Sequence, residues 1–518
     1  MKRITGAATA LLLSFVLLAG CAAKSTGTTE AATSAATTAS AASSTIDTAD
    51  MFTDRDMEST YNAAESTNIK LNDDASTSDG KGVTIKGNKI TITTEGTYIL
   101  SGSLSNGQVV VDASTDAKIQ LVFNGVDITN VSSAAIYVKQ ANKVFVTTAN
   151  GAENKLTVTG EYVAIDDNNI DAAIFSKTDL TLNGAGTLTI DSNYGHGVAS
   201  KDDLAITGGT YVVTATSNGL SGKNSVRIAD GTFTITAGKD GIHSENTDDT
   251  TKGFVYIAGG TISISAGKQG VQGDASVSIA GGTINITKSY EGIEGPVINI
   301  SGGDTTIVSS DDGMNAAECY TQSGSKTNSM ANDSNLSINI SGGNLAVNAS
   351  GDGIDSNGSL TISGGVITVS GPTENMDGTL DFNGTATISG GTLLGAGSSG
   401  MAVQFASTST QASILYVLSN AQQAGTAVTL KDASGNVIEQ FTPTKQFQSV
   451  NISAAGLVVG STYTLSVGSQ DYSIELTAVT YSNSSGGMGG GMGGGAQGGK
   501  QGGGPGGGFG GKGQAPQN

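Results

Sequence analysis

A motif of two short apolar strands, joined by a Gly-Gly pair and followed by a polar–Gly–apolar turn, returns about every 22 residues. Two consecutive copies read YIAGGTISISAGKQGVQG from Tyr256 and SIAGGTINITKSYEGIEG from Ser278. A single unit of this length cannot bury its own apolar face, so such repeats are stable only when they stack as coils. The sequence therefore predicts a stack of coils, with the recurring turn residues aligned in columns on its surface.

Within each repeat the strand residues alternate in polarity. In the run from Ile262 to Ser265, the isoleucines can face the core while the serines face solvent. A repeat of this length has room for three short strands and their bends, and parallel crossovers are almost always right-handed. The sequence predicts an all-β, right-handed parallel β-helix of about eleven coils of about 22 residues. The 76 glycines, 5 prolines and lack of tryptophan fit short strands and tight turns.

The N-terminal end differs from the repeats. Residues 1–21 have a basic start, an apolar run and small residues before Cys21, which is the pattern of a bacterial lipoprotein signal peptide. Cys21 would be the lipidated residue, and an ordinary secretory signal with an incidental cysteine is the alternative. Residues 22–50 are almost entirely Ala, Ser and Thr and are interpreted as a tether. These features predict a lipoprotein on the extracellular face of the bacterial cell membrane.

The rest of the chain divides into three parts by composition. Residues 51–410 are predicted to form the β-helix with an N-terminal cap, and residues 411–482 a small β domain. That domain should contain a hairpin around residues 434–436. Residues 483–518 form a Gly-rich tail that is expected to be disordered. A formal net charge of -20 disfavours nucleic acid as a partner and favours metal cations.

Aligning the polar–Gly–apolar turns gives two columns of side chains, three residues apart. The first column runs through His196, Asn218, Asp240, Gln269, Glu291, Asp312, Asp352 and Asn375. The second runs through Ala199, Ser221, His243, Gln272, Glu294, Asn315, Asp355 and Gly378, with Asp377 beside the last. Two ionised carboxylates stacked about 4.8 Å apart repel by roughly 3 kcal/mol at an effective dielectric of 20. The acid-rich later coils therefore need cations or must spread apart.

Calcium is the cation that this pattern favours, because carboxylates, Asn amides and turn carbonyls are hard oxygen ligands and the expected compartment is extracellular. The candidate ligands are Glu291, Glu294, Asp311, Asp312, Asn315, Asp352, Asp355 and Asp377. The alternative is that Asp-Gly and Asn-Gly pairs simply form tight turns. That alternative explains Asn218 well, but it explains the paired spacing of Glu291 with Glu294 poorly.

A lysine follows the apolar turn residue by three positions in four of the earlier coils. These residues are Lys139, Lys177, Lys201 and Lys223. Stacked ammonium groups suggest an anionic partner such as a uronate carboxylate, and Lys177, Lys201 and Lys223 are candidate ligand-binding residues. The alternative is that Asp179, Asp202 and Asp203 neutralise them on a solvated face.

Three longer segments are distinctive: TITTEGTYILSGSLSNGQVVVDA from Thr91, SSDDGMNAA from Ser309 and SGDGIDSNGSLTISGG from Ser350. In these segments the chain resembles a family of secreted clostridial carbohydrate-binding β-helix proteins. The resemblance extends from about Met51 to Tyr481. It implies a pectate-lyase-like right-handed helix with bound calcium that binds cellulose and acidic sugars.

Three functions are compatible with these observations, and no catalytic residue is assigned. The leading hypothesis is a lipid-anchored, calcium-assisted carbohydrate-binding protein for a plant-type polysaccharide such as cellulose or pectin. The second is a surface adhesin or spacer without a sugar ligand. The third is a calcium-dependent polysaccharide lyase, whose base would have to be a lysine such as Lys223 or Lys268, because arginine occurs only at Arg3, Arg55 and Arg227.

Overall fold

The computed structural model describes residues 50–165, 169–319 and 332–484, all within the unit Asp47–Asn518. Cys21, nearly all of the predicted tether and the tail from residue 485 lie outside the described residues. The all-β prediction is confirmed for the described part, where the one helix is the single-turn α1 (Asp54–Met57). None of the described helices is long and apolar enough to cross a bilayer.

The described strands form three sheets of 23, 13 and 4 strands. The 23-stranded sheet contains β1 (Thr67–Leu71), β2 (Thr77–Ser78), β5 (Gly96–Leu104), β7 (Lys118–Asn130), β9 (Lys143–Thr148), β10 (Glu153–Val158), β12 (Asp179–Gly184), β13 (Thr187–Ser192), β15 (Asp203–Ala215), β17 (Ser225–Ala237), β19 (Phe254–Ile257), β20 (Thr261–Ala266), β22 (Ser276–Ile279), β23 (Thr283–Ser289), β25 (Val297–Ile300), β26 (Asp304–Ser309), β28 (Ser337–Asn348), β30 (Ser359–Ser370), β32 (Ala386–Ile388), β33 (Thr392–Gly397), β34 (Ser413–Gln422), β37 (Phe447–Ser453) and β40 (Thr480–Ser482).

The other two sheets are smaller. The 13-stranded sheet contains β3 (Val83–Lys86), β4 (Lys89–Ile92), β6 (Gln108–Asp112), β8 (Ile136–Gln140), β11 (Ala172–Ser176), β14 (His196–Ser200), β16 (Leu220–Gly222), β18 (Ile242–Ser244), β21 (Val271–Gly273), β24 (Ile293–Glu294), β27 (Met314–Ala316), β29 (Ile354–Ser356) and β31 (Leu380–Phe382). The four-stranded sheet contains β35 (Val428–Lys431), β36 (Val437–Phe441), β38 (Thr462–Val467) and β39 (Gln470–Glu475).

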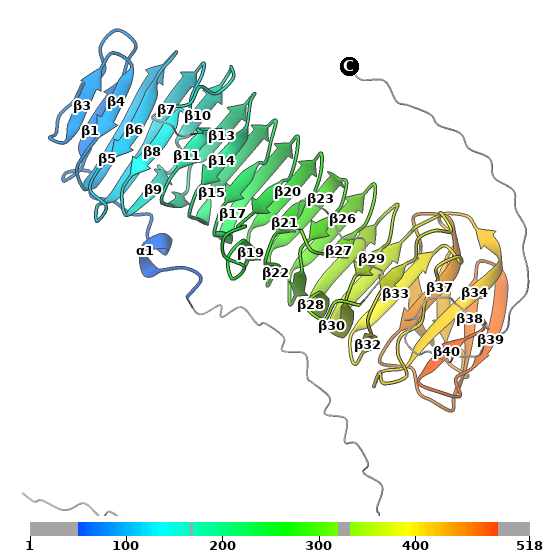
Figure 1. The fold of residues 1–518 in the computed structure, drawn as a ribbon. Coiled ribbons are helices and arrows are strands. Elements are labelled where there is room, and N and C mark those ends of the chain that lie inside the picture. Colours follow the sequence, from blue (N-terminus) through cyan, green and yellow to red (C-terminus); the bar gives the residue numbers. More distant parts are fainter. Residues whose placement is uncertain (1–49, 166–168, 320–331, 485–518) are drawn as a thin grey trace, which may run out of the picture. The chain divides into compact units, whose positions relative to one another are not determined.

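Each coil of the repeat pairs in parallel with the next coil, so equivalent residues form ladders. Ile262 of β20 pairs with Ile284 of β23, which pairs with Thr305 of β26. Figure 1 shows the strands following one another in chain order along the stack. The predicted alternation is confirmed, since Ile262 and Ile264 are 1% and 0% exposed. One continuous apolar core extends from Ile69 to residues of the last coils.

The Gly-Gly pair bends the chain between two strands of a coil. Its second residue has a positive φ, for example 92° at Gly282 and 82° at Gly303. A Cβ at Gly303 would also lie 2.7 Å from the carbonyl oxygen of Gly282 in the preceding coil. Glycine therefore recurs at this position for two reasons, the backbone conformation and the close approach of the neighbouring coil.

Gly303→Ala is expected to destabilise the fold by more than the about 1–2 kcal/mol that a left-handed conformation costs an alanine. The excess comes from the collision with Gly282. Gly425→Ala is the matched control, because Gly425 has nearly the same φ of 83° and a Cβ at that position would meet no other atom within 4 Å. Equilibrium urea unfolding measures the free energy of unfolding of both variants. Equal losses would show that the contact with the neighbouring coil adds no cost to an alanine at position 303.

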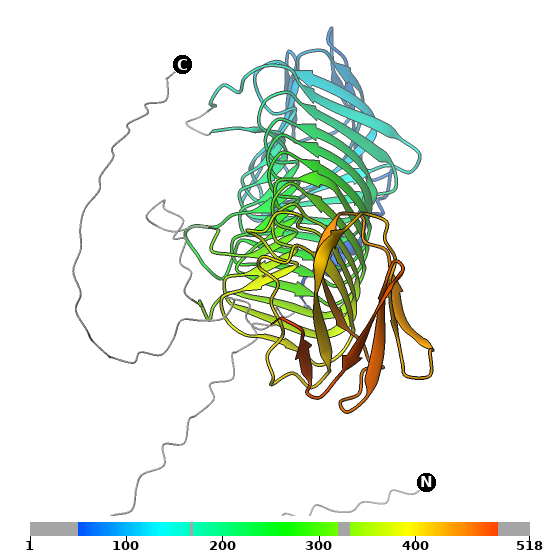
Figure 2. The ribbon, with the colours of Figure 1, turned by 90° about the vertical axis from the view of Figure 1, so that its right-hand side faces the viewer.

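The C-terminal strands lie against the last coils. Strand β37 pairs antiparallel with both β33 and β34, and Figure 2 shows these orange strands beside the final yellow coils. Strands β35 and β36 form the hairpin predicted around residues 434–436, with Lys431 opposite Val437. A separate apolar cluster fills this part, including Ile414, Leu465 and Ile474. The hairpin is thereby held next to the surface of the stack.

Candidate carboxylate site on the turn columns

The turn before each short strand of the 13-stranded sheet places the first column of side chains. In these coils a glycine follows the column residue, and its amide donates to the carbonyl of the column residue in the next coil. Gly292 N–H donates to Asp312 O (3.0 Å), and Gly313 N–H donates to Asp352 O (2.9 Å). This ladder brings Glu291, Asp312 and Asp352 together from three adjacent coils. Although 40 residues separate the two aspartates in sequence, they are neighbours in space, and Asp352 N–H donates to Asp312 Oδ1 (2.7 Å).

The second column lies on the short strands themselves. Glu294 of β24 pairs with Asn315 of β27, which pairs with Asp355 of β29. Asp355 then pairs with Asp381 of β31, where the sequence alignment had placed Gly378. The alignment was therefore out by three residues. Gly353 N–H donates to Gly378 O (3.0 Å), so Gly378 and not Asn375 holds the first-column position, and Thr379 stands where the other turns have glycine.

Three carboxylates converge at the centre of the columns. Glu291, Asp311 and Asp312 each offer an oxygen, and these oxygens all lie within 4.8 Å of one another. Glu291 is only 5% exposed, and the two aspartates are half-buried. Gly351 makes this approach possible, because a Cβ there would lie 2.5 and 2.6 Å from carboxylate oxygens of Asp312 and Asp311. We call Glu291, Asp311 and Asp312 the carboxylate cluster.

Burial and mutual repulsion oppose ionisation in and next to this cluster. Burial, followed by the charges of Asp355, Asp352 and Asp311, raises the pKa of Asp312 to about 9. Burial also raises the pKa of Asp352 to about 7 and that of Asp355 to about 8. These carboxyls are therefore costly to ionise unless a cation accompanies them.

Two acids lie at the far end of the columns, the sequence-predicted Asp377 and Asp381, which was not predicted. Burial raises the pKa of Asp377 and of Asp381, and neighbouring carboxylates add to the effect at Asp377. The Gly378 amide donates to Asp352 Oδ1 (2.5 Å), so the residue after Asp377 contacts the column directly. Asp377 therefore lies beside the column, whereas Asp381 is a member of it.

Neutral amides hold the buried glutamates in place. Gln269 Nε2 donates to Glu291 Oε2 (3.3 Å), and Asn315 Nδ2 donates to Glu291 Oε1 (3.2 Å). Gln272 Nε2 donates to Glu294 Oε2 (3.0 Å), and Glu294 is fully buried. Amide donors orient the carboxylates without neutralising them.

The donor set fits a hard divalent cation such as calcium on two observations of this structure. Asn315 is 8% exposed and its Oδ1 atom is buried without a hydrogen-bond partner. Among the described residues, no lysine, arginine or histidine forms an ion pair with the three residues of the carboxylate cluster. Several carboxylate oxygens and one unsatisfied amide oxygen are the ligand types that calcium takes.

A second acidic group in the earlier coils provides a contrast. Asp179, Asp202 and Asp203 also bring carboxylate oxygens within 4.8 Å of one another. Here, however, Arg227 Nη2 lies 3.1 Å from Asp203 Oδ2 and supplies a positive charge. Ser225 Oγ also donates to Asp203 Oδ1 (2.7 Å). Arg227 thus supplies a positive charge to this group, whereas none of the described basic residues forms an ion pair with the carboxylate cluster.

The same columns carry histidines in the early coils. Burial lowers the pKa of His196 to about 4. At His243, burial opposes the positive charge, but the hydrogen bond to Asp240 (3.0 Å) and nearby carboxylates raise the pKa overall. The columns therefore change chemistry along the stack, as the sequence predicted, and the acid-rich part begins at Glu291.

The predicted lysines have individual partners. Lys201 Nζ lies 3.8 Å from Asp171 Oδ2 and 5.3 Å from the ring centre of Phe175. Lys223 pairs with Asp248. Lys177 is exposed and makes no ion pair among the described residues. The structure thus pairs two of the three lysines, with aspartates other than those named from the sequence.

An exposed ladder next to the first column was not identified from the sequence. It consists of the residues just before the column positions, which are Lys239, Lys268, Tyr290 and Asp311. Backbone bonds link them in order, with Tyr290 N–H donating to Lys268 O (2.6 Å) and Asp311 N–H to Tyr290 O (2.9 Å). The Tyr290 side chain is 50% exposed. A hydrogen bond to Asp311 and the charge of that carboxylate raise the pKa of Tyr290 to about 12.

Part of the chain is similar to known proteins. Residues 86–335 match a family model described as carbohydrate-binding domain-containing protein. This part of the chain is similar to that family. A protein of Acetivibrio thermocellus with the same description is 36% identical over 146 residues, which are 28% of this chain and 51% of that protein. The chain thus spans about half the length of this curated relative.

One solved structure is also similar. It is described as the polysaccharide lyase-like protein from C. thermocellum, gadolinium derivative, and is 37% identical to this chain. The match covers 46% of this chain and 93% of that chain, with a TM-score of 0.40. The family match includes the carboxylate cluster and the exposed ladder but not Asp352, Asp355 or Asp381.

Proposed function

We propose that this protein binds an acidic polysaccharide through calcium held in the later turn columns. The observation that supports this proposal is the carboxylate cluster, which is half-buried to buried and lacks a protein cation among the described residues. The exposed Tyr290 lies beside it, and the exposed Lys268 and Lys239 follow one and two coils further along the same row. Glu291, Asp311 and Asp312 would hold the ion, with Asn315 as a further oxygen ligand. When bound, calcium supplies positive charge that neutralises these carboxylates and coordinates a sugar carboxylate.

The exposed ladder provides the remaining contacts for a linear chain of uronates. Lys239 and Lys268 make no ion pair among the described residues, so their ammonium groups are available to sugar carboxylates. The Tyr290 ring can pack against the apolar face of a sugar ring. Because consecutive coils are about 4.8 Å apart, these groups recur in line along the stack. The sugar chain would therefore run along the stack and cross the strands.

The proposal also includes the handedness of the coils and the position of the protein at the cell surface. A right-handed winding of the coils follows from the handedness of parallel crossovers. A lipid on Cys21, followed by the Ala/Ser/Thr-rich segment to residue 50, would attach the folded part to the extracellular face of the membrane. From that position the protein could hold polysaccharide at the bacterial cell surface.

The test is affinity electrophoresis of the full chain in gels that contain polygalacturonate. Lys239→Ala combined with Lys268→Ala should weaken calcium-dependent retention by about 2-fold to 30-fold, since each exposed ion pair contributes about 0.2–1 kcal/mol. Lys86→Ala with Lys89→Ala is the matched control, because both lysines are exposed on the β3–β4 hairpin and the charge change is the same. Equal losses in the two double variants would contradict a specific lysine ladder.

The same samples distinguish the two alternative functions. A lyase would release unsaturated uronides, whose ultraviolet absorbance would increase during incubation; the exposed Lys268, one coil before Tyr290, is the observation that favours this alternative. A spacer without a sugar ligand would show no retention in any gel. We expect retention with constant absorbance.

A further inference from the structure

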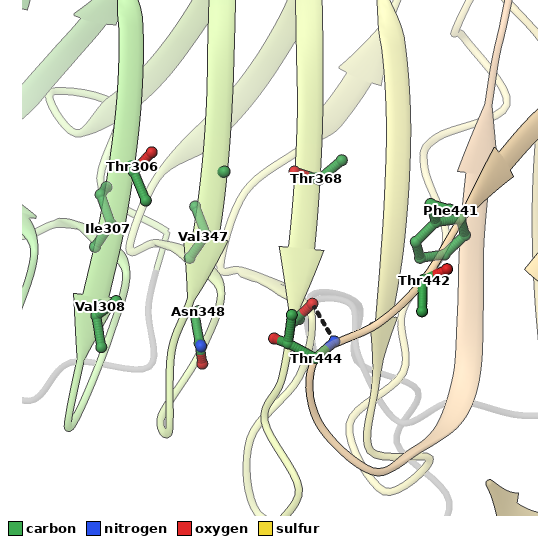
Figure 3. A pocket seen from close by; sticks show the side chains of 11 residues that line it. Thr306, Ile307, Val308, Val347, Asn348, Thr368, Phe441, Thr442 and Thr444 are labelled. Carbon is green, nitrogen blue, oxygen red and sulfur yellow. Dashed lines mark hydrogen bonds between the residues drawn. The ribbon is translucent and has the colours of Figure 1, made fainter. Parts of the chain in front are cut away.

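An open groove of about 320 Å³ lies between the last coils and the C-terminal hairpin. Its floor is the outer face of β26, β28 and β30, and its wall is formed by the end of β36 and the turn after it. Figure 3 shows the floor residues Thr306 and Thr368 on the two strands that flank β28, with Phe441 and Thr442 on the chain segment beside them. The groove shares no lining residue with the carboxylate cluster, although Val308 precedes Asp311 by only three residues.

Two outward rows of small, mostly polar side chains form the floor. Thr306, Ala346 and Thr368 are in register on the three strands, with the small Ala346 between the two threonines. Asn348 and Ser370 form the next row, beginning at Val308. The intervening residues, such as Val347, point into the core and are buried. The floor therefore combines hydroxyl and amide groups with the apolar Ala346 and Val308.

The wall is fixed to the floor by hydrogen bonds. Thr444 N–H donates to Ser370 Oγ (3.1 Å), as the dashed line in Figure 3 marks. Lys445 Nζ donates to Ala349 O and to Ser350 Oγ. Phe441 is half-buried and packs against the C-terminal apolar cluster. Because both sides are held in the folded chain, a ligand would enter a groove that is already formed.

The lining favours an uncharged, hydroxyl-rich ligand. None of its eleven residues is acidic or basic, although the chain carries a formal net charge of -20. Threonine, serine and asparagine can donate to and accept from sugar hydroxyls. The Phe441 ring offers the one aromatic surface of the lining against which the C–H face of a sugar can pack. A charged uronate would find no partner here.

We propose that this groove binds a neutral saccharide, independently of calcium. The inference deepens the proposed function and rests on it, since it gives a sugar-binding protein a second, uncharged site. Phe441 would provide the packing surface, while Thr306, Thr368 and Asn348 would bond the hydroxyls. An acidic polysaccharide and a neutral one could then be held on different parts of the same stack.

Isothermal titration calorimetry with cellohexaose, xylohexaose and mannohexaose, in the presence of EDTA, tests the proposal. The full wild-type chain should bind at least one of them. Phe441→Ala should weaken that binding by about tenfold, the usual scale of an aromatic contact. Ala346→Tyr should weaken it as well by filling the floor between Thr306 and Thr368, and it leaves the sequence of the hairpin unchanged. Val437→Ala is the control, because Val437 is exposed on the same strand outside the groove.

Calcium-dependent retention of the same variants on polygalacturonate separates this inference from the proposed function. Groove variants that lose neutral sugar but keep polygalacturonate support a second site. The inference is overturned if no neutral oligosaccharide binds to the wild type, if binding survives both groove variants, or if EDTA abolishes it. In each of those cases polygalacturonate retention would still report on the carboxylate cluster alone.

Discussion

Replacing Glu291 by Gln together with Asp312 by Asn should abolish the stabilisation that calcium gives to the folded chain. The two changes remove two of the three carboxylates whose oxygens lie within 4.8 Å of one another, while the amides preserve side-chain shape. For the wild type, calcium at about one hundredfold above its Kd should add about 2.7 kcal/mol. In a unit of this size that corresponds to a rise in Tm of about 3 °C. Differential scanning calorimetry with calcium and with EDTA measures the difference.

Without calcium the same double variant should be more stable than the wild type, because it lacks carboxylates that repel one another. Asp304→Asn is the matched control, since Asp304 is exposed in the same coil and only accepts a hydrogen bond from Asn344 (2.6 Å). If the double variant keeps the full calcium-dependent rise in Tm, calcium binds elsewhere.

The calcium effect should grow with pH. Asp312, Asp352 and Asp355 have pKa values of about 9, 7 and 8 in the folded chain, against about 3.9 for an unfolded aspartate. Between these limits the folded chain binds more protons than the unfolded chain. The free energy of unfolding in EDTA should therefore fall as pH rises from about 4 to about 9. Calcium needs the ionised carboxylates, so the gap between calcium and EDTA should widen over the same range.

Asp56→Ala should destabilise the folded chain by about 3–5 kcal/mol, because it removes one partner of a buried ion pair. Asp56 is fully buried, and its Oδ1 lies 2.7 Å from Nζ of Lys143, which is 8% exposed. Thr181 Oγ1 also donates to Asp56 (2.5 Å). The variant would leave the lysine charge buried without a partner. Urea unfolding measures the loss.

Two comparisons test this interpretation of Asp56. Asp54→Ala changes an exposed acid in the same helix and should cost little. Combining Asp56→Ala with Lys143→Met should recover part of the loss, since no charge is then left unpaired. Burial opposes ionisation of Asp56, but hydrogen bonds from Lys143, Thr181 and Thr53 lower its pKa to about 2. Its contribution should therefore be complete above about pH 4 and be lost as the pH falls towards 2.

Local repetition made most of the stack predictable. The period, the inward isoleucines and the stacking of the turn columns all depend on residues close in sequence, and Ile262 and Ile264 are buried as expected. The acid-rich coils could be located for the same reason. The alignment was wrong by three residues in the last of these coils, and Asp381 was missed because Thr379 stands where the other turns have glycine. The alternation of Leu380, Asp381 and Phe382 was the available signal.

Other parts of the site depend on residues that sequence patterns do not connect. The exposed ladder of Lys239, Lys268 and Tyr290 was missed because its members share a position but not a residue type. The pairing of Asp56 with Lys143 joins an N-terminal turn to the stack. The groove at Phe441 exists because β36 is held against strands more than 70 residues earlier in the chain. Only the folded chain brings these groups together.

The central claim is that calcium in the turn columns joins this protein to an acidic polysaccharide. Isothermal titration calorimetry of the full chain with oligogalacturonate at pH 8, first with calcium and then with EDTA, tests it most directly. The account predicts saturable binding with calcium and none with EDTA. Binding of equal affinity under both conditions, or none under either, would contradict it.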